Sequence, residues 1–275
     1  MKKKKLPLWP SVILVVIALV LDWLGIIQFG SSESPSGAGD VTDAPLSGRT
    51  DHLLGGQPTG RLLKQLDRIG YSIGYDEARG NPAWVAYHLV GGPKFDSGDR
   101  PGFHTDKETI AAVSRGDYTH SGYDRGHMAP NYAIVTRYGE EAQKQTFLMS
   151  NIIPQTPELN QRTWRMLEED VAGSGGIAER VGEVWVLTGP IYDSRSESLN
   201  GKVDVPSHCY KIILDEHDGG YRALAFLFPQ EPGDDAQPED FLTTVDAIEQ
   251  KVGLDFFPDL SGADAMEASR ASTLW

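Results

Sequence analysis

The spacing of apolar residues divides the chain into an apolar leader, a polar connector and a long body of mixed character. In the body, "PAWVAYHLV" over 82–90 alternates apolar and polar residues after a Gly-Asn-Pro break, which predicts a β-strand. Four further apolar runs predict strands of similar length, at 146–154, 183–192, 208–216 and 221–229.

Helical spacing is confined to two segments of the body. Apolar residues recur at helical intervals from Leu159 to Val171, and glycines end the run at 173–176. A second helix is expected over 238–254, with an acidic start and a glycine stop, while the turn-rich stretch 91–106 predicts a surface loop. Strands outnumber helices and do not alternate strictly with them. This pattern favours an α+β fold with a central antiparallel or mixed sheet flanked by helices.

The leader carries a targeting signal. Four lysines precede an apolar run from Ser11 to Phe29, which keeps the first residues in the cytoplasm and sends the body outside it. The run is barely long enough to span a bilayer, which takes about 20 residues. No clear cleavage site follows, so residues 1–29 are interpreted as a membrane anchor, with a cleaved signal peptide as the alternative. The body is then periplasmic or extracellular: membrane-anchored, or secreted after cleavage.

Composition completes the domain organisation. Residues 30–50 are rich in Gly, Ser, Pro and Asp and predict a flexible linker. Residues 51–262 are expected to fold as one domain, and 263–275 to form a C-terminal tail. The lone cysteine, Cys209, excludes an intramolecular disulfide and a cysteine-rich zinc site. Its apolar run predicts an inert, buried thiol.

The charge of the chain opposes a nucleic-acid partner. The formal net charge is −14, and the lysines of the leader make the remainder still more acidic. Even the region 91–130 holds five Lys or Arg residues against six Asp or Glu residues. Such a surface repels nucleic acid unless a local basic site or a bound cation offsets the repulsion, and any affinity should fall with salt.

The stretch "YDRGHMAP", 123–130, concentrates reactive side chains. His127 can accept a proton near neutral pH, because an unperturbed imidazole has a pKa of about 6.5. Arg125 offers a fixed fork of donors for phosphate, and Gly126 allows a close backbone approach. Asp124 can orient the base or pair with an arginine. A base beside a phosphate clamp is what phosphodiester hydrolysis requires.

Asn160 and Glu168 are candidates for holding a metal. Eight residues of helix leave a net rotation of about 80°, so both side chains can face the same side, two turns apart. Their oxygen atoms suit Mg²⁺, which keeps several waters and takes few protein ligands. Taken alone, each is an ordinary helix residue, a cap or part of a solvated face.

These features together resemble the DNA/RNA non-specific endonucleases, the family of Serratia-type and endonuclease G-like nucleases with a D-R-G-H motif. The resemblance spans about residues 50–260 and implies a ββα-metal-finger (His-Me finger) fold. It also implies Mg²⁺-dependent hydrolysis of DNA and RNA with little sequence preference, with Mn²⁺ as a substitute ion. Beyond "SGYDRGHMAP", it is carried by "TFLMSNIIPQTPELNQRTWRMLE", "VLTGPIYD", "VPSHCYKIIL" and "GLDFFPDL".

The resemblance assigns a role to each candidate. It makes His127 the general base and Asn160 the single protein ligand of Mg²⁺. Glu168 falls on the carboxylate that orients the waters of the metal. Asn151, at a strand end, supports the site, and Asp124 is expected to hold its neighbours in place.

Two arginines are expected near the phosphate. Arg125 matches the arginine of the signature, as a catalytic and substrate-binding residue. Arg100, in "RPGFHTD", matches an upstream arginine with the same role, although the spacing differs by about one residue, so His104 stays open as an alternative.

The expected partners are DNA and RNA as substrates, the membrane through the N-terminal helix, and a second copy of the chain in a homodimer. Two other functions stay open. One is a non-catalytic nucleic-acid receptor outside the cytoplasm. The other is a phosphodiesterase that acts on a small or lipid substrate, for which the acidic body and the membrane tether argue.

Overall fold

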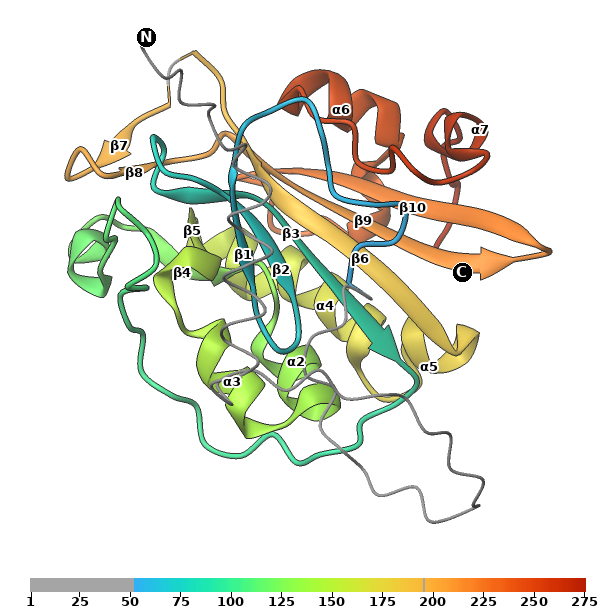
Figure 1. Cartoon of the computed structure of the whole chain (residues 1–275), viewed down its shortest axis with the longest axis horizontal. Helices are drawn as coiled ribbons and strands as arrows, with labels where there is room; N and C mark the ends of the chain where they lie inside the picture. Colours follow the sequence, from blue (N-terminus) through green and yellow to red (C-terminus); the bar gives the residue numbers. More distant parts are fainter. Residues whose placement is uncertain (1–51, 195) are drawn as a thin grey trace, which may run out of the picture. The chain divides into compact units, whose positions relative to one another are not determined.

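The computed structural model describes residues 52–194 and 196–275, and a seven-stranded sheet is its largest element (Figure 1). Every neighbouring pair of strands is antiparallel, in the order β1-β2-β3-β6-β9-β10-β11. The strands are β1 (Lys64–Asp67), β2 (Ser72–Asp76), β3 (Asn81–Val90), β6 (Glu183–Ile191), β9 (His208–His217), β10 (Gly220–Pro229) and β11 (Leu242–Thr243). A separate small hairpin joins β7 (Ser198–Leu199) to β8 (Val203–Asp204). The α+β class is therefore confirmed.

Helices cover both faces of this sheet. Successive side chains of a strand point to opposite faces, so in β3 Val85 and Tyr87 enter one apolar cluster while Trp84 and Ala86 enter another. Burial on both faces explains why the central strands are almost continuously apolar. The first cluster packs against α2 (Asn131–Tyr138), α3 (Glu140–Thr146), α4 (Trp164–Ala172) and α5 (Ile177–Val181), and the second against α6 (Val245–Val252) and α7 (Ala263–Glu267).

The strands predicted at 82–90, 183–192, 208–216 and 221–229 are confirmed by β3, β6, β9 and β10. The strand predicted at 146–154 is wrong over its first half. Helix α3 runs through Thr146, a 3-10 turn, η2, covers Met149–Asn151, and only then does β5 (Ile152–Gln155) begin. The apolar run there is buried, but burial alone does not distinguish a strand from a turn of helix.

The helix predicted at 238–254 is only partly correct. Its first half is a 3-10 turn, η4 (Pro238–Phe241), followed by the short strand β11. Helix α6 starts after Thr244, whose Oγ1 accepts a hydrogen bond from the backbone N–H of Ala247 at 3.1 Å. A threonine cap of this kind fixes the start of a helix.

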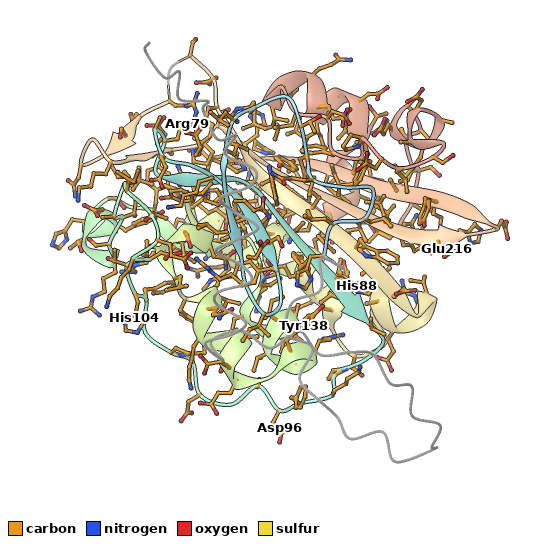
Figure 2. The ribbon with its side chains drawn as sticks, in the orientation of Figure 1. Arg79, His88, Asp96, His104, Tyr138 and Glu216 are labelled. Atoms are coloured by element: carbon orange, nitrogen blue, oxygen red, sulfur yellow. The ribbon has the colours of Figure 1, made fainter. Side chains whose placement is uncertain are left out.

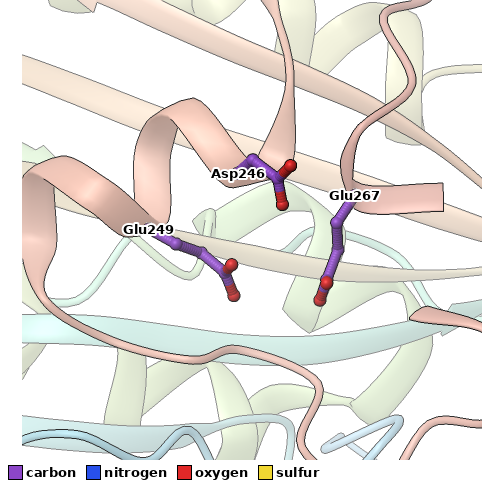
Figure 3. A group of neighbouring side chains, drawn as sticks. All are labelled: Asp246, Glu249 and Glu267. Atoms are coloured by element: carbon purple, nitrogen blue, oxygen red, sulfur yellow. The ribbon is translucent and has the colours of Figure 1, made fainter. Parts of the chain in front are cut away.

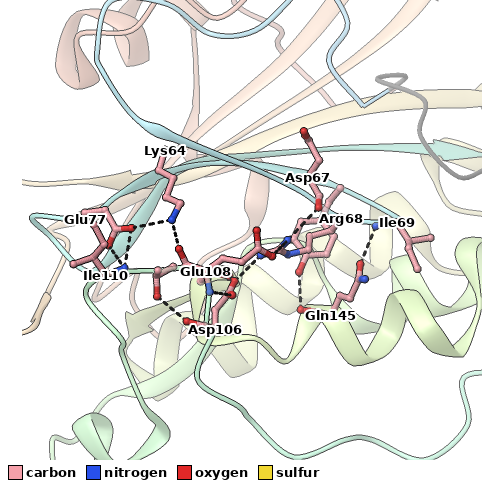
Figure 4. A network of polar contacts seen from close by, with 12 residues as sticks. Lys64, Asp67, Arg68, Ile69, Glu77, Asp106, Glu108, Ile110 and Gln145 are labelled. Atoms are coloured by element: carbon pink, nitrogen blue, oxygen red, sulfur yellow. Dashed lines mark hydrogen bonds and ion pairs between the residues drawn. The ribbon is translucent and has the colours of Figure 1, made fainter. Parts of the chain in front are cut away.

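The loop 91–123, predicted to be a surface loop over residues 91–106, runs along the edge of the molecule from the end of β3 (Figure 2, which labels Asp96 and His104). Asp106 anchors it, accepting hydrogen bonds from Arg68 at 2.7 Å and from Ser150 at 2.6 Å (Figure 4). The backbone of His104 also bonds to that of Phe147 and to that of Met149, the first residue of η2. The loop, which ends past the short turn η1 (Arg115–Tyr118), is thereby pinned beside β5.

The remaining predictions concern the two ends of the chain: an N-terminal anchor and linker, and a C-terminal tail. The expected anchor and linker, residues 1–50, lie outside the described residues. In residues 52–194 and 196–275, no helix has the length and apolarity needed to cross a bilayer. The segment 263–275, expected as a tail, begins with α7, whose Ala263 and Met266 pack into the second apolar cluster.

Candidate active site

A ββα unit builds the site from the D-R-G-H motif. The motif forms β4 (Asp124–His127), which pairs antiparallel with β5, with Asp124 opposite Gln155 and His127 opposite Ile152. A π-helical turn, η3 (Leu159–Thr163), then leads into α4. Gly126 makes the strand pair possible, because a Cβ there would lie 1.9 Å from Oε1 of Gln155.

Five of the predicted residues line one cleft of about 710 Å³. They are Arg100, Arg125, His127, Asn160 and Glu168. His104 instead lines a different cavity with Pro101 and Asp106, so the structure places Arg100, and not His104, at the cleft.

The imidazole of His127 is held in an apolar setting. Its ring centroid lies 4.8 Å from that of Phe147, in a T-shaped contact, and 5.5 Å from that of Phe103. Burial, assisted by the positive charge of Arg100, lowers the pKa of His127 to about 3. Its Nε2 is buried and has no hydrogen-bond partner among the described residues. The ring is therefore neutral at neutral pH, and a nitrogen is left to accept a proton.

Asp124 fixes the side chain of Asn160. One of its carboxylate oxygens accepts hydrogen bonds from Nδ2 of Asn160 at 2.9 Å and from Nε2 of Gln161 at 2.7 Å. These contacts orient the Asn160 amide, and its Oδ1 makes no hydrogen bond to the described part of the chain. A carbonyl oxygen held in this way suits a hard cation such as Mg²⁺.

Glu168 meets a buried lysine that the sequence did not single out. The Nζ of Lys211 lies 3.4 Å from Oε1 of Glu168 and 4.1 Å from the centroid of the Trp164 ring. Burial raises the pKa of Glu168 above its usual value, and the charge of Lys211 opposes that shift. The lysine thus favours the ionised carboxylate at the wall of the cleft.

Arg100 and Arg125 bring positive charge to the cleft. Their guanidinium carbons lie 5.5 Å from the Phe147 ring centroid and 5.2 Å from that of Phe103, respectively. Within residues 52–194 and 196–275, no carboxylate forms an ion pair with either arginine. Two such guanidinium groups on one wall favour an anionic ligand.

Asn151 lies behind the site. Its Oδ1 accepts from the backbone N–H of Ala129 at 2.8 Å, and its Nδ2 donates to the carbonyl oxygens of Ala129 and Thr146, both at 3.0 Å. The side chain is fully buried and holds the turn that follows His127. Its position fits the supporting role expected of it.

Sequence reasoning missed four residues of this site. Gln161 is adjacent to Asn160, and an amide doublet at a helix start was a usable signal. Lys211 is a charge inside an apolar strand, which marks a buried ion pair. Phe103 and Phe147 are separated from the motif along the chain, and no spacing rule connects them to His127.

Comparison with known proteins adds independent information. The family described as DNA/RNA non-specific endonuclease matches residues 50–263. Mitochondrial endonuclease G of Bos taurus is 33% identical over 252 residues, covering 85% of this chain and 82% of that protein. A nuclease of Nostoc sp. is 31% identical over 229 residues, covering 76% and 81%. A crystal structure of the EndoG/EndoGI complex matches with a TM-score of 0.64 at 28% identity, covering 74% of this chain and 89% of that one.

Proposed function

The chain belongs to the DNA/RNA non-specific endonuclease family and is a nuclease, and on that premise we propose that His127 is its general base and Asn160 its Mg²⁺ ligand. One observation carries the proposal. The buried, unpartnered Nε2 of His127 lies on a cleft that also holds the oriented amide of Asn160 and two arginines. The residues that the proposal needs as base, metal ligand and anion site therefore line one cleft.

The residues divide the reaction between them. Nε2 of His127 takes a proton from the attacking water as the water oxygen bonds to phosphorus and the bond to the 3′-oxygen breaks, and the departing 3′-oxygen takes a proton from solvent water. The products carry 5′-phosphate and 3′-hydroxyl ends. Arg100 and Arg125 hold the phosphate oxygens and offset the charge that develops there. Contacts to phosphate, and not to base edges, account for cleavage without sequence preference.

The donors at the cleft fit a divalent ion. The Oδ1 of Asn160 would be a direct ligand, and the carboxylate of Glu168 would orient the waters of the ion. When bound, Mg²⁺ would supply positive charge next to the phosphate and the leaving oxygen. Mn²⁺ prefers the same oxygen donors and serves as the substitute ion.

Degradation of plasmid DNA and of RNA in Mg²⁺ tests this mechanism. His127→Ala should lower the rate by about 10²–10⁴-fold, the usual contribution of a general base. His104→Ala is the matched control and should cleave normally, because His104 lines another cavity. Cleavage that survives EDTA or His127→Ala overturns the mechanism. Turnover of bis-nitrophenyl phosphate without cleavage of nucleic acid would favour the other phosphodiesterase function.

We further propose that the leader carries the nuclease domain out of the cytoplasm and tethers it to the membrane, and that two chains form a homodimer. The lysines and apolar run of residues 1–29 support the first proposal. Cell fractionation with mass measurement of the mature N-terminus tests export and cleavage, and light scattering of the purified protein tests the dimer.

A further inference from the structure

Three carboxylates converge on the face of the sheet opposite the catalytic cleft (Figure 3). Asp246 and Glu249 lie on α6, three residues apart, and Glu267 ends α7. One oxygen of each lies within 4.8 Å of the others. The two helices meet over the second apolar cluster, to which Val245, Ile248 and Met266 belong.

Glu267 is the member of this cluster that needs a partner. Its side chain points at the other two carboxylates, only 7% of the residue is exposed, and its buried Oε1 has no hydrogen-bond partner among the described residues. A buried ionised carboxylate without a partner is costly, so the protein must neutralise it in some way.

The surrounding charges increase this cost. Burial and the carboxylates of Glu249, Asp255, Asp246 and Asp264 all raise the pKa of Glu267, to about 7. Within the described residues, no lysine, arginine or histidine forms an ion pair with the three cluster members. Among the three side chains, only that of Glu249 has a hydrogen bond within the described residues, accepted from the backbone N–H of Phe256 at 2.7 Å. A proton or a bound cation must therefore balance the cluster.

We propose that Asp246, Glu249 and Glu267 form a Ca²⁺ site that joins α6 to α7. Ca²⁺ binds carboxylate oxygens at 2.3–2.6 Å, so two ligands on opposite sides of the ion are about 5 Å apart, and separations below 4.8 Å fit a single ion. Three carboxylates from two short helices suit its flexible coordination. Mg²⁺ demands a stricter geometry and retains its waters, which disfavours an all-carboxylate site of this kind.

The site is structural and separate from catalysis. An ion bridging α6 and α7 holds the C-terminal helix against the second apolar cluster, while the cleft lies on the first face. An ion that binds the native chain alone stabilises it in proportion to the logarithm of its concentration. The readout is therefore thermal stability, which does not depend on how the cleft works.

Melting of the full chain at about pH 8, above the usual carboxylate range, tests the proposal with Ca²⁺ or with a chelator. About 10 mM Ca²⁺ should raise the melting temperature of the wild type by roughly 5 °C if the ion binds at about 0.1 mM. Glu267→Gln should lose this rise. In chelator it should melt at or above the melting temperature of the wild type, because the repulsion between its carboxylate and those of Asp246 and Glu249 is removed. Glu140→Gln, which removes an exposed carboxylate on α3, is the control and should respond like the wild type.

Each other outcome overturns the proposal. Equal responses of wild type and Glu267→Gln, or no response to Ca²⁺, mean that a proton balances the cluster. A Glu267→Gln variant that is destabilised equally in Ca²⁺ and in chelator shows a packing role only. Mg²⁺ as effective as Ca²⁺ rejects the choice of ion. Asn160→Ala should keep the rise, and its loss there would place the responding ion in the catalytic cleft.

Discussion

His127 lies in an apolar setting that lowers its pKa, as its proposed role as a base requires. Its folded pKa of about 3 lies below the ordinary 6.5 of the unfolded chain, so the native state stays unprotonated in mild acid. As the pH falls below about 6.5, the unfolded chain takes up a proton that the native chain refuses. The stability contributed by this group is full above that pH and is lost progressively below it.

Urea unfolding in EDTA, measured over a series of pH values, tests whether stability falls in this direction. Between pH 7.5 and 5.5, the wild type should lose stability relative to His127→Asn, by about 1 kcal/mol near the acid end. His104→Asn, which removes an exposed imidazole, should follow the wild type. A constant difference between His127→Asn and the wild type across the series would contradict the lowered pKa.

In the proposed mechanism, Asp124 acts on the metal through its hydrogen bond to Asn160. Asp124→Ala frees the amides of Asn160 and Gln161, so we expect activity to fall by about 10–100-fold and the Mg²⁺ requirement to rise. Steady-state rates across a Mg²⁺ titration measure both effects. Asp99→Ala, at an exposed loop position, is the control, and an unchanged Mg²⁺ requirement in Asp124→Ala would refute the positioning role.

At this scale the sequence located the candidate residues of the cleft but not their contacts. A short motif at the right spacing is enough to find His127, Asn160 and Glu168. The role of Asp124 depends on a hydrogen bond across 36 residues of chain, and the setting of His127 depends on two phenylalanines from other segments. Such contacts exist only after the chain has folded.

At the scale of elements, β4 and β5 approach so closely that only glycine fits at position 126. Gly126→Ala would press a methyl group into the Gln155 side chain, which should destabilise the protein by about 1–3 kcal/mol and lower activity. Denaturant unfolding measures the loss. Gln155→Ala in the same chain should recover part of it, and Gly102→Ala, with open space around it, should cost little.

The buried pair of Lys211 and Glu168 links β9 to α4. Lys211→Met leaves the carboxylate without its counterion, so we expect a loss of about 2–4 kcal/mol and a shift of the acid limb of activity to higher pH. A double-mutant cycle with Glu168→Gln measures the coupling by denaturant unfolding. If the stability losses of the two single variants add up to that of the double variant, and the pH profile of activity does not move in Lys211→Met, the pairing is contradicted.

Long central strands were predictable because both of their faces are buried, which leaves a continuous apolar signal. The short strands β1 and β2 and the helices α2 and α3 were missed, since each is brief and mixed in polarity. The sequence predicts a single strand at 146–154, because an apolar run of this kind is buried whether it is helical or extended. Tertiary contacts, such as those of Asp106, decide its conformation.

At the scale of the whole molecule, an acidic protein must bind a polyanion. The slight excess of acidic residues in 91–130 predicts weak attraction for a polyanion, but a count does not reveal which charges are paired within the protein. Asp106 pairs with Arg68 and Asp124 holds two amides, whereas Arg100 and Arg125 face the cleft. Folding thus leaves the cations available and occupies these acids.

Binding should therefore be modest and sensitive to salt. With about two or three phosphates contacted, the logarithm of the association constant should fall with the logarithm of salt at a slope of about −2 to −3. Arg100→Ala should flatten that slope by about one, measured by fluorescence anisotropy on duplex DNA with Ca²⁺ in place of Mg²⁺. Lys144→Ala, on α3 and outside the residues that line the cleft, should leave the slope unchanged. A slope that Arg100→Ala does not alter would remove that arginine from the substrate path.

Helices α6 and α7 lie on one face of the sheet and the cleft lies on the other. This arrangement gives the molecule a preferred orientation relative to a nucleic acid. Near a nucleic acid, the acidic cluster is pushed away while the arginines are drawn in, so the strand exerts a torque that turns the cleft toward it. Salt limits this torque to roughly the last 8 Å of approach at physiological ionic strength. An ion bound by the three carboxylates would cancel part of their charge and weaken this torque. Ion binding would therefore stabilise α6 and α7 but lower the fraction of encounters in which the cleft faces the nucleic acid.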